Sequence, residues 1–209
     1  MKTIYFIRHA ESEANAGFTT INDNSIALTA KGREQAAQLA NAISFQPDLI
    51  ICSKYIRTQQ TAAPLLLKYP HIPVKILPIH EFTYLSPKAC TGTTTQQRQN
   101  QVFDYWDACS PQFIHGEEAE SFMQFTQRID HILQCLEMRE ANNIIAFTHG
   151  HVLRAIWQQL AGYKFNTETE RMHYFHHQMS LLPAPNTCIY KATFQKNQWQ
   201  IIEPQFKTN

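Results

Sequence analysis

The 209-residue sequence has no excess of either charge, no long apolar run and no closely spaced cysteine pair. Lys and Arg total 18 against 17 for Asp and Glu. This balance gives no broad positive surface for nucleic acid or an anionic membrane. No apolar stretch approaches the roughly 20 residues of a membrane-spanning helix. The chain also reaches Arg8 and His9 before a signal-peptide core is complete. We therefore expect a soluble protein that is not secreted.

The cysteine count is odd, and no CxxC motif occurs, which argues against a disulfide framework and a zinc knuckle. The five cysteines are Cys52, Cys90, Cys109, Cys135 and Cys188. We predict that they are reduced and mostly buried, in a cytoplasmic protein. A hydrophobic content of 44% with 17% charged residues is typical of a folded globular chain.

Strand-like and helix-like patterns alternate along the chain. Apolar runs predict buried strands at residues 3–7, 49–52 and 143–147, and Pro78 makes 74–79 an edge strand or strand end. Helical patterns cover residues 29–43 with Thr29 as N-cap, 55–68 and 152–160. Residues 187–194 and 199–202 flank a polar turn and predict a hairpin. The fold class is α/β, a three-layer, mostly parallel sheet flanked by helices with an antiparallel edge.

Residues 85–139 lack strand patterns and contain two helical ones, so we predict a helical cap insertion there. No linker or repeat separates it from the rest. The chain is therefore interpreted as one domain, 1–209. Its aromatic group, Phe103, Tyr105, Trp106 and Phe113, is assigned to packing within the cap, because no basic groove accompanies it that would favour base stacking.

Polar side chains with phosphate chemistry follow four of the predicted strands. They are Arg8, His9, Ser53, Arg57, Glu81 and His149. Ligands of open α/β sheets bind beyond the carboxyl ends of the strands, so we expect these groups to meet. Guanidinium groups match phosphate oxygens, and a neutral imidazole accepts a phosphoryl group. We assign Arg8 and Arg57 to phosphate binding, His9 to nucleophilic attack, His149 to hydrogen bonding of the moving phosphoryl group, and Glu81 to protonating the leaving oxygen.

Several motifs spread along the chain resemble those of the histidine phosphatase superfamily, also called the phosphoglycerate mutase-like family. The matching residues are Arg8, His9, Glu11 and Asn15; Leu28, Thr29, Gly32 and Gln35; Ser53, Arg57, Thr58 and Thr61; Thr148, His149 and Gly150; and Pro185 with Asn186. The resemblance implies a phosphohistidine on His9, a phosphate pocket of Arg8, Arg57 and His149, Glu81 as proton donor, and substrate contacts from Asn15, Ser53 and Gly150. Ala119, Glu120, Ser121 and Arg128 resemble the start of the family's cap helix.

Some assignments keep an alternative. Phe82 and Thr83 depart from the family pattern after Glu81, which leaves a solvated loop carboxylate as its other interpretation. Ser53 is equally explained as a helix cap. Glu11 is given a supporting role at a helix start. His173, His176 and His177 have helical spacing, so they form either a metal site or, the interpretation we favour, a solvated or cap-facing helix.

The predicted function is a phosphatase that hydrolyses a small phosphate monoester through phosphohistidine, with no cofactor and no metal. A phosphomutase uses the same residues and is the nearest alternative. A non-catalytic protein that binds phosphorylated ligands and a metallohydrolase are the others. The expected partner is a small phosphorylated metabolite, with no nucleic acid and no membrane. Neither its identity nor the oligomeric state can be inferred from the sequence.

Overall fold

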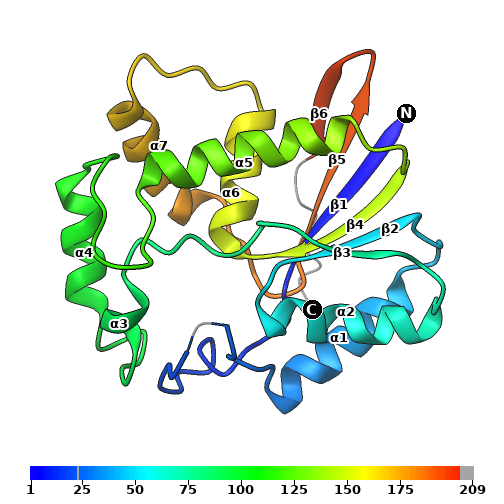
Figure 1. Cartoon of the computed structure of the whole chain (residues 1–209), viewed down its shortest axis with the longest axis horizontal. Helices are drawn as coiled ribbons and strands as arrows, with labels where there is room; N and C mark the ends of the chain where they lie inside the picture. Colours follow the sequence, from blue (N-terminus) through cyan, green and yellow to red (C-terminus); the bar gives the residue numbers. More distant parts are fainter. Residues whose placement is uncertain (23, 203–209) are drawn as a thin grey trace.

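A six-stranded mixed sheet forms the centre of the protein in the computed structural model, which describes residues 1–22 and 24–202 (Figure 1). The strand order is β3-β2-β4-β1-β5-β6. The strands are β1 (Lys2–Arg8), β2 (Leu49–Cys52), β3 (Val74–Ile76), β4 (Asn143–Thr148), β5 (Ile189–Gln195) and β6 (Gln198–Ile202). Strands β3, β2, β4 and β1 pair in parallel, and β5 and β6 add the antiparallel edge. The predicted fold class is confirmed.

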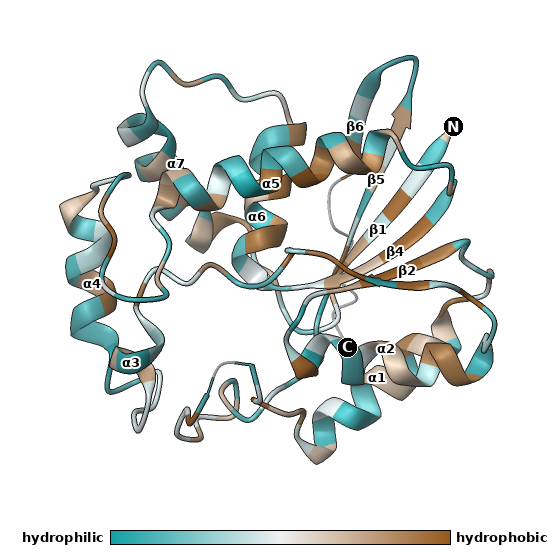
Figure 2. Cartoon of the chain, viewed as in Figure 1, coloured by the Kyte–Doolittle hydropathy of each residue, from teal (hydrophilic) through white to brown (hydrophobic). Residues whose placement is uncertain are grey.

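Helices cover both faces of this sheet, as Figure 1 shows. Helices α1 (Ala30–Ala42) and α2 (Ile56–Lys68) lie on one face, and α5 (Phe122–Glu137) and α6 (Gly150–Leu160) lie on the other. Strand β4 shows why: Ile144 and Ala146 pack into one apolar cluster, while Ile145 and Phe147 pack into the second. A strand buried on both faces has no polar alternation, which explains the continuous apolar runs of the sequence. In Figure 2, β2 and β4 are mostly brown, the colour of hydrophobic residues.

Local sequence signals set the helix starts. The Thr29 side chain accepts a hydrogen bond from the Gly32 amide at 2.9 Å and caps α1. Ser121 and Gln124 form a reciprocal capping box at the start of α5. Gly32 has a further role, because a Cβ there would lie 2.0 Å from the Glu11 carbonyl oxygen. Only glycine lets α1 approach the segment after β1 so closely.

Strand β3 is shorter than the predicted strand at 74–79. It ends at Ile76, and the chain continues through Pro78, which has no amide hydrogen to donate. The strand lies at the edge of the sheet, as expected for a Pro-containing segment. Residues 77–85 therefore form an extended connection without regular structure, and Glu81 lies within it.

Three helices lie between β3 and β4: α3 (Pro87–Cys90), α4 (Gln99–Ala108) and α5. The sequence predicted two of them and missed the four-residue α3. Tyr105 and Trp106 are buried as expected, but Phe103 and Phe113 are 66% and 47% exposed, so packing within the cap was wrong for those two. The single-domain interpretation and the cap limits 85–139 stay predictions.

Helix α7 (Glu168–Leu181) follows α6 and completes the helices of the described residues. Within residues 1–22 and 24–202, no helix combines the length and apolarity that crossing a bilayer requires. None of the five cysteines forms a disulfide bond. Cys52, Cys90 and Cys188 are buried as predicted, whereas Cys109 and Cys135 are partly exposed.

Candidate active site

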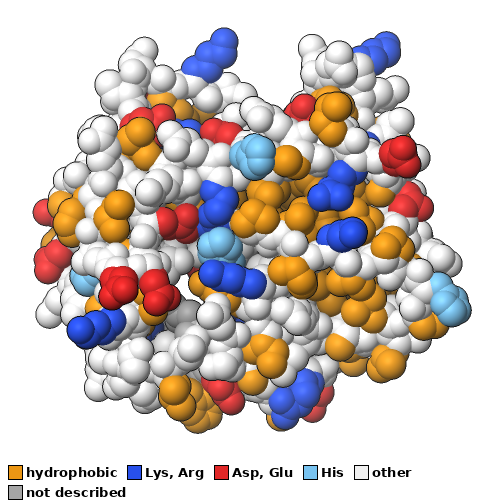
Figure 3. Space-filling view, viewed as in Figure 1, with side chains coloured by type: hydrophobic (Ala, Val, Ile, Leu, Met, Phe, Trp, Pro, Cys, Tyr) orange, Lys and Arg blue, Asp and Glu red, His pale blue; other side chains and the backbone are white. Residues whose placement is uncertain are grey.

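The two histidines that follow β1 and β4 lie side by side. These strands are neighbours, with Arg8 paired to Thr148, and the His9 amide donates to the Thr148 carbonyl at 2.9 Å. The His9 and His149 ring centroids are 5.1 Å apart, and both side chains are buried. Lys, Arg and His side chains gather near the middle of the face in Figure 3. The expected convergence at the strand ends is observed for these two rings.

The His9 ring is held in the form that a nucleophile needs. Its Nδ1 lies 2.7 Å from the Ala10 carbonyl oxygen. A carbonyl only accepts, so Nδ1 carries the hydrogen and Nε2 keeps its lone pair. Burial, followed by the charges of Arg57 and Arg8, lowers the pKa of His9 from 6.5 to about 3. Nε2 is therefore unprotonated and available for attack at neutral pH.

The orientation of His149 depends on Ser53. The Ser53 hydroxyl lies 2.8 Å from Nε2 of His149 and accepts from the Tyr55 amide at 3.2 Å. The other ring nitrogen, Nδ1, is buried and has no hydrogen-bond partner among the described residues. Burial and then Arg57 hold the pKa of His149 well below its usual value. His149 is thus neutral, Ser53 positions its ring, and Nδ1 is left for a ligand.

Arg57 and Arg8 reach the histidines from different elements. Arg57 begins α2, is buried, and its guanidinium carbon lies 4.5 Å from the centre of the Tyr55 ring. The Tyr55 ring in turn packs edge-on against His149 at 5.3 Å. Arg8 ends β1 and donates to the Ala184 carbonyl, while its buried Nε has no hydrogen-bond partner within the described residues. An unpaired guanidinium donor beside two neutral histidines suits an anionic ligand.

Asn15 and Glu11 belong to the scaffold of the loop after β1. The Asn15 side-chain oxygen accepts from the Ser12 amide at 3.2 Å and from Asn186 at 3.1 Å. Asn186 also donates to the His9 carbonyl at 2.9 Å, so it ties this loop to the nucleophile. The Glu11 carboxylate binds the Thr29 hydroxyl and the Lys31 ammonium, both at 2.8 Å. Its supporting role at the start of α1 is as expected.

Glu81 is placed by contacts from distant parts of the chain. The Thr148 hydroxyl donates to the Ile79 carbonyl at 2.7 Å. Arg128 of α5 donates to the His80 carbonyl at 3.1 Å and pairs with Glu120, which accepts from the Thr83 amide. This explains the motif at 119–121 with Arg128: it fixes the connection that carries Glu81.

The Glu81 carboxylate faces several hydrogen-bond donors. Its Oε1 accepts from the Phe82 and His151 amides, both at 3.1 Å, and the His151 Nδ1 lies 3.3 Å away. Burial alone would raise the pKa of Glu81, but the His151 ring and the Phe82 amide outweigh it and hold that pKa well below its usual value. Glu81 is therefore ionised in the free protein, and its use as an acid requires proton uptake with the ligand.

Gly150 has no side chain, which leaves space between Arg8, Glu81 and Arg154. A Cβ on Gly150 would lie 3.4 Å from Arg154 Nη1, 3.7 Å from Glu81 Oε2 and 3.8 Å from Arg8 Nε. A side chain there would occupy the volume between two guanidinium groups and the carboxylate. The structure thus brings Arg8, His9, Arg57, Glu81 and His149 together. Their catalytic roles, and substrate contacts from Asn15, Ser53 and Gly150, stay predictions.

Sequence reasoning missed Tyr55, His151 and Arg154. Arg154 follows Gly150 by four residues, one helical turn, so the helical period of α6 already indicated that both share a face. Tyr55 directly precedes α2, and no pattern in the sequence indicated that its ring would contact both Arg57 and His149. His151 follows Gly150 directly, and no pattern in the sequence indicated that its ring would lie 3.3 Å from the Glu81 carboxylate.

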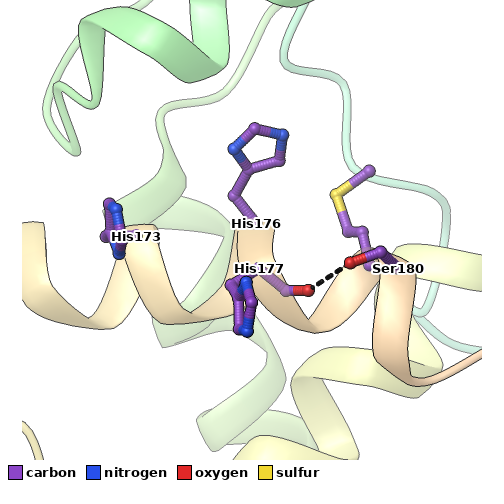
Figure 4. Close-up of a pocket in the computed structure, with 5 residues that line it drawn as sticks. His173, His176, His177 and Ser180 are labelled. Carbon is purple, nitrogen blue, oxygen red and sulfur yellow. Dashed lines mark hydrogen bonds between the residues drawn. The ribbon is translucent and has the colours of Figure 1, made fainter.

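The histidines of α7 lie outside this site. His173, His176 and His177 line a hollow of about 490 Å³ together with Met179 and Ser180. In Figure 4 the three rings point in different directions. Among the described residues, no group of three His, Cys, Asp or Glu side chains is arranged to hold a metal ion. His176 stacks on Trp106 of α4 at 5.0 Å, so the favoured cap-facing interpretation is correct.

Comparison with known proteins agrees with this geometry. The family model described as "Histidine phosphatase superfamily (branch 1)" matches residues 4–206. The adenosylcobalamin/α-ribazole phosphatase of Escherichia coli (strain K12) is 30% identical over 165 residues, which are 76% of this chain and 79% of the relative. Its Salmonella typhimurium counterpart is 26% identical over 161 residues, 75% and 78% of the two chains.

Solved structures share the fold at lower identity. The α-ribazole phosphatase from Shigella flexneri superposes with a TM-score of 0.76 at 22% identity, covering 97% of this chain and 95% of that one. A phosphoserine phosphatase from Entamoeba histolytica gives 0.75 at 18% identity, covering 100% and 98%. The named relatives are phosphatases, which confirms hydrolysis of a small phosphate monoester as the reaction class. With a family model that spans nearly its whole length, the chain belongs to branch 1 of the histidine phosphatase superfamily.

Proposed function

We propose that His9 takes the phosphoryl group of the substrate, and that Arg8, Arg57 and His149 hold the phosphoryl oxygens during transfer. The observation that supports this most is the state of His9: a buried, neutral imidazole whose Nδ1 is committed to the Ala10 carbonyl, so that Nε2 is the nucleophilic atom. The guanidinium groups offset the negative charge of the phosphoryl group, and they do not have to rearrange as this group moves.

In the first step, the Nε2 lone pair of His9 forms a bond to phosphorus while the bond from phosphorus to the ester oxygen breaks. The oxygen leaves with the electron pair of that bond and takes a proton from Glu81. The carboxyl holds this proton because the incoming phosphate dianion raises the pKa of a neighbouring carboxylate. The products are phosphohistidine, an alcohol and the Glu81 carboxylate.

In the second step, water replaces the alcohol. Glu81 accepts a proton from the water as its oxygen bonds to phosphorus, and the bond between phosphorus and Nε2 breaks with its electrons returning to His9. Inorganic phosphate leaves. The Nδ1 hydrogen bond to Ala10 keeps the ring in the same orientation through both steps.

The substrate is proposed from the relatives. The E. coli and Salmonella proteins are named as acting on adenosylcobalamin and α-ribazole compounds, so α-ribazole 5′-phosphate is the first monoester to test on this chain. We also propose a cytoplasmic location, in keeping with five cysteines of which none forms a disulfide bond.

The test is a screen of phosphate monoesters, with α-ribazole 5′-phosphate, phosphoserine and an aryl phosphate included and chelator present throughout. Wild-type protein should release phosphate, and rapid quenching with radiolabelled substrate should trap an acid-labile phosphoprotein. His9→Ala should do neither, whereas His71→Ala, at an exposed position, should match wild type. Phosphate release by His9→Ala, or activity that chelator abolishes, would overturn the proposal.

The same screen separates hydrolysis from mutase chemistry. A phosphomutase returns the phosphoryl group to the substrate, so phosphoglycerate would give isomer rather than free phosphate. We expect free phosphate to exceed isomer formation. If isomer were the main product, His9 would still be the nucleophile, but the proposed hydrolysis would be overturned.

A further inference from the structure

The His151 ring is oriented toward the proposed proton donor by its packing rather than by other polar contacts. Trp106 and Phe175 lie nearly parallel to it, with ring centroids 6.2 and 6.1 Å away and interplanar angles of 23° and 25°. Tyr84 meets it edge-on at 5.7 Å. The side chain is 16% exposed, so few other ring orientations are open to it. The ring has one carboxylate within reach, Glu81.

Neither nitrogen of the His151 ring has a hydrogen-bond partner of good geometry in the described part of the chain. Nδ1 lies 3.3 Å from Glu81 Oε1, longer than the 3.1 Å bond from the His151 amide to the same oxygen. A buried donor without a partner is costly, and contacts of catalytic groups in a free enzyme are commonly long until substrate binds. The His151 Nδ1 and Glu81 Oε1 atoms are therefore close enough that a small approach would complete a hydrogen bond.

The two oxygens of Glu81 have different surroundings. Oε1 receives the Phe82 amide, the His151 amide and the His151 ring. Within the described residues, Oε2 accepts one longer hydrogen bond, 3.4 Å, from the His151 amide, and it lies toward Gly150, where Arg154 and Arg8 also point. Donors stabilise an unprotonated oxygen, so a proton on this carboxyl resides on Oε2.

We propose that His151 is a positioning residue for Glu81: its ring holds Oε1 so that Oε2 presents the proton to the leaving oxygen. This inference rests on the proposed role of Glu81 and goes beyond it by assigning the oxygen and the residue that fixes it. His151 touches neither the phosphoryl group nor the nucleophile in this scheme. It acts through Glu81 alone, in the acid step that releases the alcohol and in the base step that activates water.

The test compares two leaving groups. An alkyl phosphate releases an alkoxide that needs a proton, whereas p-nitrophenyl phosphate releases a stable phenolate that does not. His151→Phe keeps the ring packing and removes Nδ1. It should lower kcat/KM for the alkyl substrate about tenfold, a part of what a general acid supplies, and leave kcat/KM for p-nitrophenyl phosphate nearly unaffected, because kcat/KM covers transfer to His9 and not the later attack by water. His151→Asn, whose amide nitrogen takes the place of Nδ1, should restore most of the loss.

Two controls make the outcome specific. His176→Phe changes the other histidine that stacks on Trp106, 5.0 Å from it, and should leave both substrates unaffected. In a Glu81→Gln background the His151→Phe change should have no further effect, because the acid is already absent. Equal losses on both substrates, or full additivity with Glu81→Gln, would overturn the inference. An unchanged His151→Phe enzyme would also overturn it while leaving Glu81 in place, whereas a Glu81→Gln enzyme that keeps its full kcat/KM on the alkyl substrate would overturn the proton donor itself.

Discussion

Burial of neutral His9 makes the stability of the protein depend on pH in a defined window. The pKa of His9 is about 3 in the folded state against 6.5 for a free imidazole. Below pH 6.5 the unfolded chain binds a proton at this residue and the folded chain does not. The free energy of unfolding is thus unaffected by His9 above pH 6.5, and it falls as the pH drops from 6.5 toward 3.

The size of the effect at pH 5 follows directly. The gap from pH 6.5 is about 1.5 pH units, and each is worth about 1.4 kcal/mol, so His9 alone costs about 2 kcal/mol of stability. His149, buried with its pKa lowered, acts in the same direction. Glu81 does not contribute between pH 5 and 7, because its pKa lies below 4.5 and it stays ionised there.

The assay is urea unfolding of wild type and His9→Asn at pH 7, 6 and 5. Asparagine keeps a donor near the Ala10 carbonyl and does not titrate. The variant should lose about 2 kcal/mol less than wild type between pH 7 and pH 5. His71→Asn, a matched change at an exposed position, shows what replacing any histidine does to the slope. Equal pH slopes for wild type and His9→Asn would refute a buried neutral His9, and with it the argument for Nε2 as nucleophile.

Three further changes test the scaffold, each by urea unfolding at pH 7. Gly32→Ala places a methyl group 2.0 Å from the Glu11 carbonyl oxygen, so α1 must shift. We expect the free energy of unfolding to fall by about 1–3 kcal/mol or more. An unchanged free energy of unfolding would mean that α1 moves freely. Lys2→Met removes a buried ammonium that donates to carbonyls at the end of α5 at 2.6 and 2.7 Å, and should cost about 1.5–3 kcal/mol unless those carbonyls find other donors. Arg128→Met leaves the Glu120 carboxylate without its ion pair, and should cost about 1–3 kcal/mol of stability and lower kcat. Adding Glu120→Gln should recover stability but not kcat. An unchanged kcat in Arg128→Met would contradict its role in positioning Glu81.

Those parts of the fold that depend on local sequence were predictable. Apolar runs mark strands buried on both faces, and Thr29 marks the start of a helix, because both effects act within a few residues. The convergence of the residues after β1 and β4 followed from the rule that parallel strands end at one edge. The C-terminal part of the predicted strand at 74–79 did not form, for a non-local reason. The carbonyl groups of this part of the chain accept hydrogen bonds from the Arg128 and Thr148 side chains instead of pairing with a strand.

Side-chain environments that form between distant elements were not predictable. Phe103 and Tyr105 lie two residues apart on α4 and therefore on opposite sides of the helix. Phe103 is exposed and Tyr105 is buried, and only the position of α4 on the rest of the protein decides which side is covered. His151 is similar, since its neighbours Trp106 and Phe175 come from two other helices. A sequence pattern gives the face of a helix but not what that face meets.

The local charge of the site also explains how a nearly neutral chain can bind an anion. The net charge of +1 suggests no electrostatic preference. Around Gly150, however, the guanidinium groups of Arg8 and Arg154 meet the carboxylate of Glu81, and Arg57 adds a third cation beside His9 and His149. The same cations and burial keep both imidazoles uncharged, so the positive charge resides on arginines alone. A phosphate dianion then meets fixed donors and an unprotonated nucleophile together, which is the combination that phosphoryl transfer to histidine requires.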